Sequence, residues 1–410
     1  MTKPIAVDLF AGCGGLSKGF EIAGFEVAAA FENWNIAADC YEANFSHPLY
    51  RTDLSNVELA ASLIRGYAPD IIIGGPPCQD FSHAGKRVEA SRASLTESFA
   101  QIVTQIRPAY FLMENVDRAQ KSNAYARARE IFKEAGYGLT ERVLLASRCG
   151  VPQRRKRFFC IGVLGSEDGA VDSLLVSRLA ENEMTVRDYL GNTLDIECYY
   201  RHPRNYNRRG IFSIDEPAPT MRGVNRPVPK GYPGHPNDAG PITPDLRPLT
   251  TLERSLIQTF PADFKWVGSK TDCEQMIGNA VPVNLARYVA EAIIIHMQSE
   301  QRAQAEAALD EGLFCAWLQE KKGLRRRSAQ DVVSRLARAN RMVPLESESR
   351  PSVYNALLDE NATFNNLSAS VQSQMHRAVR LYAEFAETKD SAEYCPVPFD
   401  DGKRSRVIAS

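Results

Sequence analysis

IAVDLFAGCGGLSKGF (residues 5–20) joins a short apolar run to a glycine-rich turn and then to a helix-like stretch. The run 5–10 has the composition of a buried strand, and 17–25 has the spacing of a helix that ends near Gly24. The alternation continues to about residue 165, with strands expected at 26–32, 70–76, 109–116, 142–147 and 154–165 and helices at 35–45 and 123–136. Strands that alternate with helices predict a parallel, doubly wound α/β sheet.

The glycine-rich turn predicts a ligand site at the carboxyl edge of this sheet. Gly12, Gly14 and Gly15 allow a ligand to approach the backbone closely. Glu32 ends the next expected strand, about 20 residues on, where a carboxylate can accept hydrogen bonds from a ribose. Asp53 follows at another strand-to-helix junction. Together they favour an adenosine-type cofactor, although a tight turn without a ligand would also fit, and the turn lacks the GK[ST] ending of a P-loop.

The composition excludes several classes of protein. The 410 residues suggest two or three domains of roughly 150 residues each, and an apolar fraction of 44% is ordinary for a globular chain. None of the nine cysteines forms a CxxC pair and the six histidines lie apart from them, so we expect no metal site and no disulfide framework. No window approaches the roughly 20 apolar residues of a membrane span, and the N-terminus has no signal pattern, so we expect an intracellular protein.

The hydrophobic periodicity of the sequence changes after about residue 165. From 166 to 245 helical periodicity is absent and prolines and glycines crowd together, which predicts a loop-rich insertion with short strands. Helix-like spacing resumes at 250–260 and 284–298. From about 300, helices are expected at 310–322, 329–341, 352–359 and 368–387, with Ser328 as the N-cap of the second. Their apolar positions predict a small helical bundle, followed by a tail of about a dozen residues.

The net charge of −1 hides three basic stretches, at 148–157, 201–210 and 321–327. A plain solvated face is the ordinary interpretation of any one such run. Two of them flank segments with other reasons to contact a nucleic acid, which favours a bipolar surface.

Cys78 lies in GGPPCQDFS (74–82), directly after an expected buried strand. A small buried hydrophobe is the ordinary interpretation of a lone cysteine, but a run of glycine and proline is poor material for a core. The two prolines stiffen the backbone and place the thiol at the carboxyl edge of the sheet. Such a thiol is a candidate nucleophile.

Two further segments bring polar groups to the same edge. Glu114 ends a strand in MENV (113–116), where a carboxyl group that is protonated can donate a hydrogen bond to a ligand. Arg155 and Arg157, in VPQRRKRF (151–158), would point to the same face of an extended segment. One of the two could reach a base, and the other a phosphate or a carboxylate.

These segments, in this order, resemble those of the DNA (cytosine-5)-methyltransferase family. The resemblance covers roughly 1–165 and 245–298, including RPLTTLERSLIQTFPADF (247–264), which buttresses the target-recognition region, and the closing motif QMIGNAVPVNLA (275–286). It implies a Rossmann-like sheet and methyl transfer from S-adenosyl-L-methionine (AdoMet) to carbon 5 of a cytosine flipped out of double-stranded DNA. The residues assigned to the AdoMet pocket are Phe10, Gly12, Gly14, Gly15, Leu16, Glu32, Asp53, Pro77, Asn279 and Ala280.

The resemblance assigns catalysis to Cys78, Glu114 and Arg155. The thiolate of Cys78 would add to carbon 6 of cytosine while Glu114 holds N3 and Arg155 holds O2, and no metal would be required. Two residues depart from the family's pattern. Asp80 stands where a small residue is usual, in the loop expected to close over DNA, and Leu256 replaces the usual arginine of the buttressing motif.

The resemblance also implies a division of labour along the chain. Residues 1–165, completed by 265–298, would form the catalytic domain, and 166–264 the target-recognition region with its buttressing motif. The expected DNA contacts are Ser82, Lys86, Arg87, Gln153, Arg157, Arg201, Arg204, Arg208, Arg209, Arg222 and Arg226. One subunit holds every catalytic part, so a monomer would suffice. Such a chain resembles a bacterial or phage modification enzyme that acts in the cytoplasm and protects host DNA against a partner restriction endonuclease.

Residues 305–395 lie outside this resemblance and are faintly similar to the core-binding domain of tyrosine recombinases. A packing or dimerisation module and an auxiliary DNA clamp both remain open, the second supported by 325–327 and Arg335. For the whole chain, the alternatives are an RNA cytosine methyltransferase and a non-catalytic DNA-binding regulator. A distinct basic recognition segment argues against the first, and an intact set of catalytic residues argues against the second.

Overall fold

The computed structural model describes residues 3–77, 94–205, 207–343 and 350–390. The protein divides into two compact units, Met1–Met297 and Gln298–Ser410. Each unit has a hydrophobic core of its own. Among the described residues, no helix is long and apolar enough to cross a membrane.

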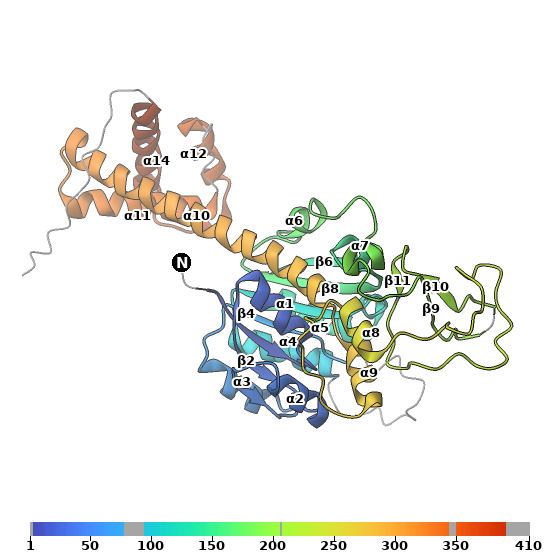
Figure 1. Ribbon diagram of the computed structural model, residues 1–410. Helices are drawn as coiled ribbons and strands as arrows, with labels where there is room; N and C mark the ends of the chain where they lie inside the picture. The colour runs from blue at the N-terminus through green and yellow to red at the C-terminus, as the bar shows by residue number, and fades with distance from the viewer. Residues whose placement is uncertain (1–2, 78–93, 206, 344–349, 391–410) are drawn as a thin grey trace, which may run out of the picture. The chain divides into compact units, whose positions relative to one another are not determined.

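A seven-stranded sheet forms the centre of the first unit, in the order β3-β2-β1-β4-β5-β8-β6 (Figure 1). Its strands are β1 (Ile5–Leu9), β2 (Glu26–Phe31), β3 (Leu49–Tyr50), β4 (Ile71–Gly74), β5 (Tyr110–Val116), β6 (Tyr137–Leu145) and β8 (Lys156–Leu164). β1 to β5 pair in parallel, whereas β8 runs antiparallel to β5 and to β6. The prediction of parallel strands throughout is therefore wrong at β8. Residues 146–155 hold only a 3-10 turn and the short strand β7 (Gln153–Arg154), and a parallel connection would need a longer crossover.

Helices cover both faces of this sheet. On β4, Ile71 and Ile73 point into one core, which includes α1 (Gly15–Ala23) and α10 (Val283–Lys322). Ile72 points into the opposite core, whose helices are α3 (Val57–Arg65), α4 (Leu95–Ile106) and α5 (Asn123–Glu134). Because side chains alternate along a strand, both faces of the sheet are buried. The prediction of a doubly wound α/β fold is confirmed.

α10 is a single helix of 40 residues that begins in the first unit and ends in the second. The sequence pattern predicts two helices here, with a break near residue 300, and this prediction is wrong. The stretch EQRAQAEAALDE (300–311) has a weak apolar pattern, but it contains no glycine or proline and is rich in good helix formers. Backbone propensity is therefore enough to continue the helix.

The region 166–264 builds short elements around a small core. β9 (Cys198–Tyr200) pairs antiparallel with β10 (Ile211–Ser213), and β11 (Ala218–Pro219) pairs in parallel with β7. The sequence pattern does not predict α6 (Asp172–Val176) and α7 (Val186–Leu190), because helices of five residues are too short to show a period. α8 (Thr251–Ile257) and α9 (Lys270–Asn279) each begin with a capping box, which fixes their first turns.

The described residues of the second unit form the end of α10 and the helices α11 (Arg326–Met342), α12 (Pro351–Asp359), α13 (Ala362–Asn365) and α14 (Ala369–Asp390). Phe314, Trp317, Leu336, Tyr354 and Phe385 are buried together in its core. α11 begins at Arg326 with Arg325 as its N-cap, so the prediction of Ser328 as the capping residue is wrong.

Candidate functional site

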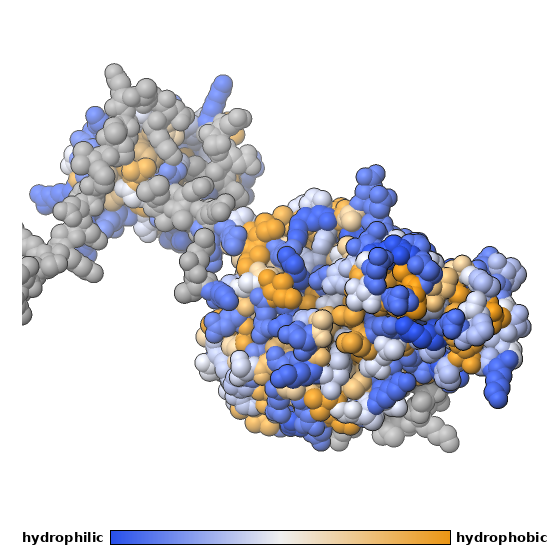
Figure 2. Space-filling view, in the orientation of Figure 1, coloured by the Kyte–Doolittle hydropathy of each residue, from blue (hydrophilic) through white to orange (hydrophobic). Residues whose placement is uncertain are grey.

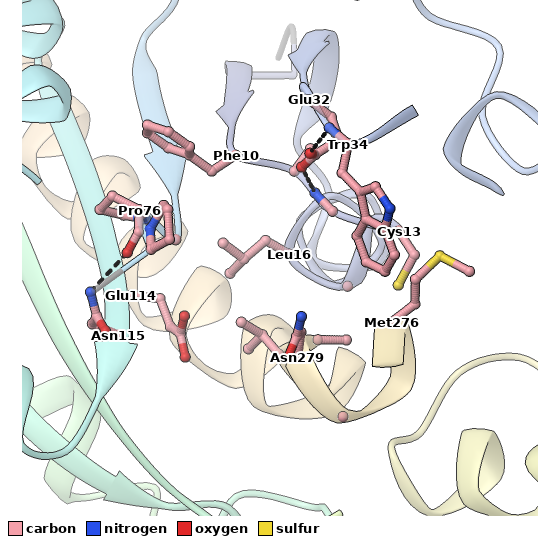
Figure 3. Close-up of a pocket in the computed structure, with 18 of the residues that line it drawn as sticks. Phe10, Cys13, Leu16, Glu32, Trp34, Pro76, Glu114, Asn115, Met276 and Asn279 are labelled. Atoms are coloured by element: carbon pink, nitrogen blue, oxygen red, sulfur yellow. Dashed lines mark hydrogen bonds between the residues drawn. The ribbon is translucent and has the colours of Figure 1, made fainter. Parts of the chain in front are cut away.

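A cavity of about 560 Å³ opens in the first unit where β1, β4 and β5 end (Figure 3). Its walls come from the turn after β1, the segment after β2, the ends of β4 and β5, and residues 276–281 of the closing segment. This is the carboxyl edge of the parallel strands, where open α/β sheets bind their ligands.

The turn between β1 and α1 requires glycine for two separate reasons. Gly14 is the N-cap of α1 and has a φ of 96°, in the left-handed region that other residues rarely adopt. At Gly15, an added Cβ would lie 2.3 Å from the carbonyl oxygen of Val281. The closing segment can therefore reach the turn only because Gly15 has no side chain.

Glu32 orders the backbone on one side of the cavity. Its Oε2 atom accepts the N–H of Gly12 at 2.7 Å, and its Oε1 atom accepts the N–H of Trp34 at 2.6 Å (Figure 3). A carboxylate has about four acceptor positions, so Glu32 can hold both backbone groups and still accept hydrogen bonds from hydroxyl groups of a ligand. The indole of Trp34 also borders the cavity and offers it a flat apolar surface.

Eight of the ten residues expected in the cofactor pocket border this cavity: Phe10, Gly12, Gly15, Leu16, Glu32, Pro77, Asn279 and Ala280. The other two, Gly14 and Asp53, are not among the described residues that line the cavity. A Cβ on Gly14 would meet the rings of Tyr41 and Phe45, so that residue faces the protein interior. Asp53 is exposed, and its Oδ1 atom accepts the N–H of Ser55 at 2.9 Å.

Sequence reasoning missed several lining residues, among them Cys13, Trp34, Asn115, Val116 and Met276. Trp34 has a usable signal, because an aromatic residue two positions after an acidic strand end is well placed to contact an adenine. The only signal for Met276 is its place in the closing motif (275–286), because its contact with the cavity depends on how α9 packs.

Glu114 and Arg157 form an ion pair at the edge of the cavity. The Nε atom of Arg157 lies 2.8 Å from Oε1 of Glu114, and both side chains border the cavity. Burial raises the pKa of Glu114, and the nearby guanidinium of Arg157 offsets part of that rise. A carboxyl group with a raised pKa is suited to donate a proton or a hydrogen bond near neutral pH.

The neighbours of Glu114 hold residues 75–77, which precede Cys78, close to it. The Nδ2 atom of Asn115 donates to the carbonyl oxygen of Pro76 at 2.9 Å. A Cβ on Gly75 would lie 3.1 Å from Oε2 of Glu114, so a glycine there lets the carboxyl group approach the loop. Cys78 itself lies outside the described residues, as do Asp80, Ser82, Lys86 and Arg87.

Arg155 does not face the cavity, in contrast to the expectation that it holds the O2 atom of cytosine. Its side chain is fully buried, and its guanidinium donates to the carbonyl oxygens of Met221 (3.1 Å), Gly278 (2.9 Å) and Ala280 (3.0 Å). The period-two argument fails because Arg155 stands between β7 and β8, where the strand is interrupted. Arg157, which is expected from the sequence to contact DNA, is the arginine beside Glu114.

Gln153 is buried as well, so the structure contradicts its expected contact with DNA. Its Nε2 atom donates to Oε1 of Gln258 at 2.7 Å, and its Oε1 atom accepts the N–H of Met221 at 2.9 Å. Gln153 and Arg155 therefore connect β7 to the region 166–264 and to residues 278–280.

Arg201, Arg222 and Arg226 border one small hollow in the region 166–264, together with Arg254. Burial, followed by the charge of Arg222, lowers the pKa of Arg201 to about 10. Arg254 forms a buried ion pair with Glu274. The first three arginines form an electropositive group suited to an anionic partner.

The other arginines expected to contact DNA lie on the same region. Arg204 and Arg208 are exposed, whereas Arg209 pairs with Glu216 and lies over the ring of Phe212, 4.3 Å from its centroid. Hydrophilic and hydrophobic residues are interspersed over the visible face of this unit (Figure 2). Glu216 balances the charge of Arg209. Arg204 and Arg208 are therefore more available than Arg209 to an anionic partner.

Comparison with known proteins gives one consistent family. A family model described as C-5 cytosine-specific DNA methylase matches residues 5–295. Type II methyltransferase M.HindV of Haemophilus influenzae is 61% identical over 292 residues, which are 70% of this chain and 95% of the relative. Type II methyltransferase M.HgiDI of Herpetosiphon aurantiacus is 54% identical over 299 residues, 73% of this chain and 96% of the relative.

The solved structure of S. pombe Dnmt2 methyltransferase has a TM-score of 0.54 at 18% identity, covers 72% of this chain and 99% of its own, and shows a shared fold. The family match coincides with the first unit, and the cavity in that unit lies among the segments that carry the resemblance. The chain therefore belongs to the C-5 cytosine-specific DNA methylases and is a DNA (cytosine-5)-methyltransferase.

Proposed function

We propose that the protein methylates carbon 5 of a cytosine flipped out of double-stranded DNA, with AdoMet as the methyl donor and Cys78 as the covalent nucleophile. The pairing of Glu114 with Arg157 at the cavity edge carries this proposal. It provides a hydrogen-bond donor and a cation near the end of β4, the strand that precedes Cys78 in the sequence.

The residues that line the cavity fit AdoMet. Glu32 retains acceptor capacity for ribose hydroxyls, and Trp34 and Phe10 offer apolar surface to an adenine. The turn at Gly15 and the closing segment at Val281 approach each other closely, which would exclude water from a bound ligand. When bound, AdoMet would supply an electrophilic methyl group carried on a sulfonium.

The chemistry requires a nucleophile because carbon 5 of cytosine is too weakly nucleophilic to attack a methyl group directly. The thiolate of Cys78 forms a bond to carbon 6, and the electrons of the 5,6 double bond move into the ring, which becomes enamine-like. Glu114 donates to N3 and Arg157 lies near O2, so both stabilise the charge that develops there. Carbon 5 would then take the methyl group as the bond from that group to the sulfonium breaks, which would leave S-adenosyl-L-homocysteine. Loss of the carbon-5 proton to a base would re-form the double bond and release the thiolate.

Base flipping is required for this geometry, since carbon 6 is inaccessible in stacked duplex DNA. We propose that Arg201, Arg204, Arg208, Arg222 and Arg226 contact the duplex through phosphates or base edges. The names of the relatives suggest a role in a type II restriction-modification system. In that role the protein would act as a monomer in the bacterial cytoplasm and protect host DNA from a partner endonuclease.

Bisulfite sequencing of DNA from cells that express the protein tests the proposal. Methylated cytosines should recur at one sequence with the wild-type protein and with Cys315→Ala, a matched change in the second unit. Cys78→Ala should give none. Normal methylation by Cys78→Ala would contradict the covalent role, and methylation of transfer RNA without DNA would contradict the substrate.

A further inference from the structure

The second unit carries a concentration of positive charge around α11. Residues 321–341 contain eight cations, Lys321, Lys322, Arg325, Arg326, Arg327, Arg335, Arg338 and Arg341. Asp331 is the only acidic residue in this stretch, so its net charge is +7 (eight minus one) in a chain whose net charge is −1.

Helical geometry gathers three of these cations on one face of α11. Ala329, Val332, Leu336 and Ala339 form the buried stripe of the helix. Arg327, Arg338 and Arg341 are exposed on the opposite side, at about 3.6 residues per turn. We call these three residues the arginine face. Among the described residues, none of the three has a carboxylate within ion-pairing distance, 4.0 Å.

α14 provides an internal comparison within the same unit. Its outer side carries Arg377 and Arg380 but also Glu384 and Glu387, all exposed, and Glu384 pairs with Lys322. Solubility is satisfied by such a mixed surface and does not require charges of one sign. Exposed Asp331 lies on the same side of α11, so this side carries three positive charges and one negative charge, whereas the outer side of α14 carries two of each. The positive excess of the arginine face indicates an anionic partner.

We infer that the arginine face binds the phosphates of double-stranded DNA without regard to sequence, as a second DNA contact outside the methyltransferase domain. Arg327 and Arg341 are 14 residues apart, about 21 Å along the helix, a length comparable to about six base pairs of duplex. Guanidinium groups match phosphate oxygens in bidentate geometry.

The inference rests on DNA as the substrate, which the family membership supplies. M.HindV is covered to 95% of its length by only 70% of this chain, so a relative with the same family domain lacks a counterpart of the remainder. The second unit is therefore dispensable for the chemistry and available for holding DNA.

The test uses the full-length protein and an A·T duplex of about 30 base pairs, long enough to exceed the arginine face and free of cytosine. The triple variant Arg327→Gln, Arg338→Gln, Arg341→Gln removes the face. The matched control Arg350→Gln, Arg377→Gln, Arg380→Gln removes the same charge from exposed positions elsewhere in the unit. Fluorescence anisotropy gives the dissociation constant of each protein at several salt concentrations. Circular dichroism verifies that both variants are folded.

The triple variant should bind this duplex at least about tenfold more weakly at 0.1 M salt, because phosphate contacts supply most of the non-specific affinity. Each lost contact should also reduce the dependence of log K on log salt concentration, the salt slope, by about 0.9. The slope itself should fall by about 2 to 3, and the control should stay within about twofold of wild type. Equal slopes for the triple variant and wild type would overturn the inference, as would an equal loss in the control. So would weakened binding of the triple variant to anionic phosphatidylglycerol vesicles with duplex binding intact.

The assay contains neither cytosine nor AdoMet, so it stays informative if the covalent mechanism fails. With a methylatable duplex, the triple variant should show a raised KM for DNA. A reduced kcat at unchanged KM would contradict a role in holding DNA.

Discussion

Nε of Arg157 lies 2.8 Å from Oε1 of Glu114 because β5 and β8 run antiparallel. In their register Glu114 is opposite Phe159, and Arg157 is two residues away on the same face of the sheet. Burial raises the pKa of Glu114 and Arg157 opposes that rise. The pair therefore holds a protonatable carboxyl group at the cavity without fixing it as an anion.

Arg157→Leu should lower kcat by about 100-fold, because one donor to the developing charge is lost. It should also raise the pKa of Glu114 further, since the opposing cation is gone. Catalysis that needs protonated Glu114 is lost as pH rises through this pKa, so the alkaline limb of the pH profile should move to higher pH. The measurement is kcat/KM against pH, with the exposed Arg154→Leu as the control. An alkaline limb that stays in place or moves to lower pH would be inconsistent with the pairing.

Arg155→Met should destabilise the protein by about 3 kcal/mol or more, because buried carbonyl groups of Met221, Gly278 and Ala280 lose their donor. The KM for AdoMet should rise, since residues 278–280 border the cavity. Thermal unfolding and AdoMet titration measure the two effects. Unchanged stability with a loss of kcat alone would restore the catalytic role expected for Arg155.

Gly15→Ala should weaken AdoMet binding by tenfold or more, since its Cβ would lie 2.3 Å from the backbone oxygen of Val281 and force the closing segment away; overpacking of this kind costs about 1–3 kcal/mol. Gly66→Ala is the control, because a Cβ there has no neighbour within 4 Å. Quenching of tryptophan fluorescence reports binding, as Trp34 borders the cavity. Equal affinities of the two variants would argue against the close approach.

Asp8 should make the stability of the protein depend on pH. It is fully buried, Ser17 Oγ donates to its Oδ2 at 2.6 Å, and burial raises its pKa from 3.8 to about 7. Because the folded-state pKa is the higher one, the stabilisation is complete below about 4 and is lost progressively as pH rises through 7. Between pH 5 and pH 8 the wild-type protein should lose about 2–3 kcal/mol at about 1.4 kcal/mol per pKa unit.

Asp8→Asn keeps an acceptor for Ser17 but carries no charge, so it should lose much less stability over this range. Denaturant unfolding at the two pH values measures the difference, with the exposed Asp263→Asn as the control. If the free energy of unfolding of Asp8→Asn depends on pH as that of the wild type does, the ionisation of Asp8 is not the cause of the pH dependence.

The family, the fold class and eight of the residues that line the cavity could be predicted from the sequence, and the comparisons confirm the family. The reason is physical: many of the lining residues stand at or just after the end of a strand, and parallel strands bring their carboxyl ends to one edge. Gly12, Glu32 and Glu114 are far apart in the chain, yet each stands at such an end.

The predictions that are wrong share another cause, since each concerns a feature that depends on tertiary contacts. Side-chain alternation along one continuous strand would place Arg155 and Arg157 on the same face. Arg155 lies between β7 and β8, where no strand is continuous, so the alternation does not apply. Gln153 resembles an exposed polar residue in sequence, and only its buried partner Gln258, over 100 positions away, gives it a structural role. The reversed direction of β8 is likewise set by the length of its connection.

The covalent role of Cys78 is tested most directly by duplex DNA in which 5-fluorocytosine replaces every cytosine. After methyl transfer, carbon 5 would carry fluorine in place of the proton that must leave, so the thioether at carbon 6 should persist. With AdoMet present, the wild-type protein should give a protein–DNA complex that survives heating in detergent, and peptide mass mapping should place the nucleotide on Cys78. Cys78→Ser should give no such complex. An enzyme that methylates ordinary DNA yet forms no stable complex, or one linked through another residue, would contradict the mechanism.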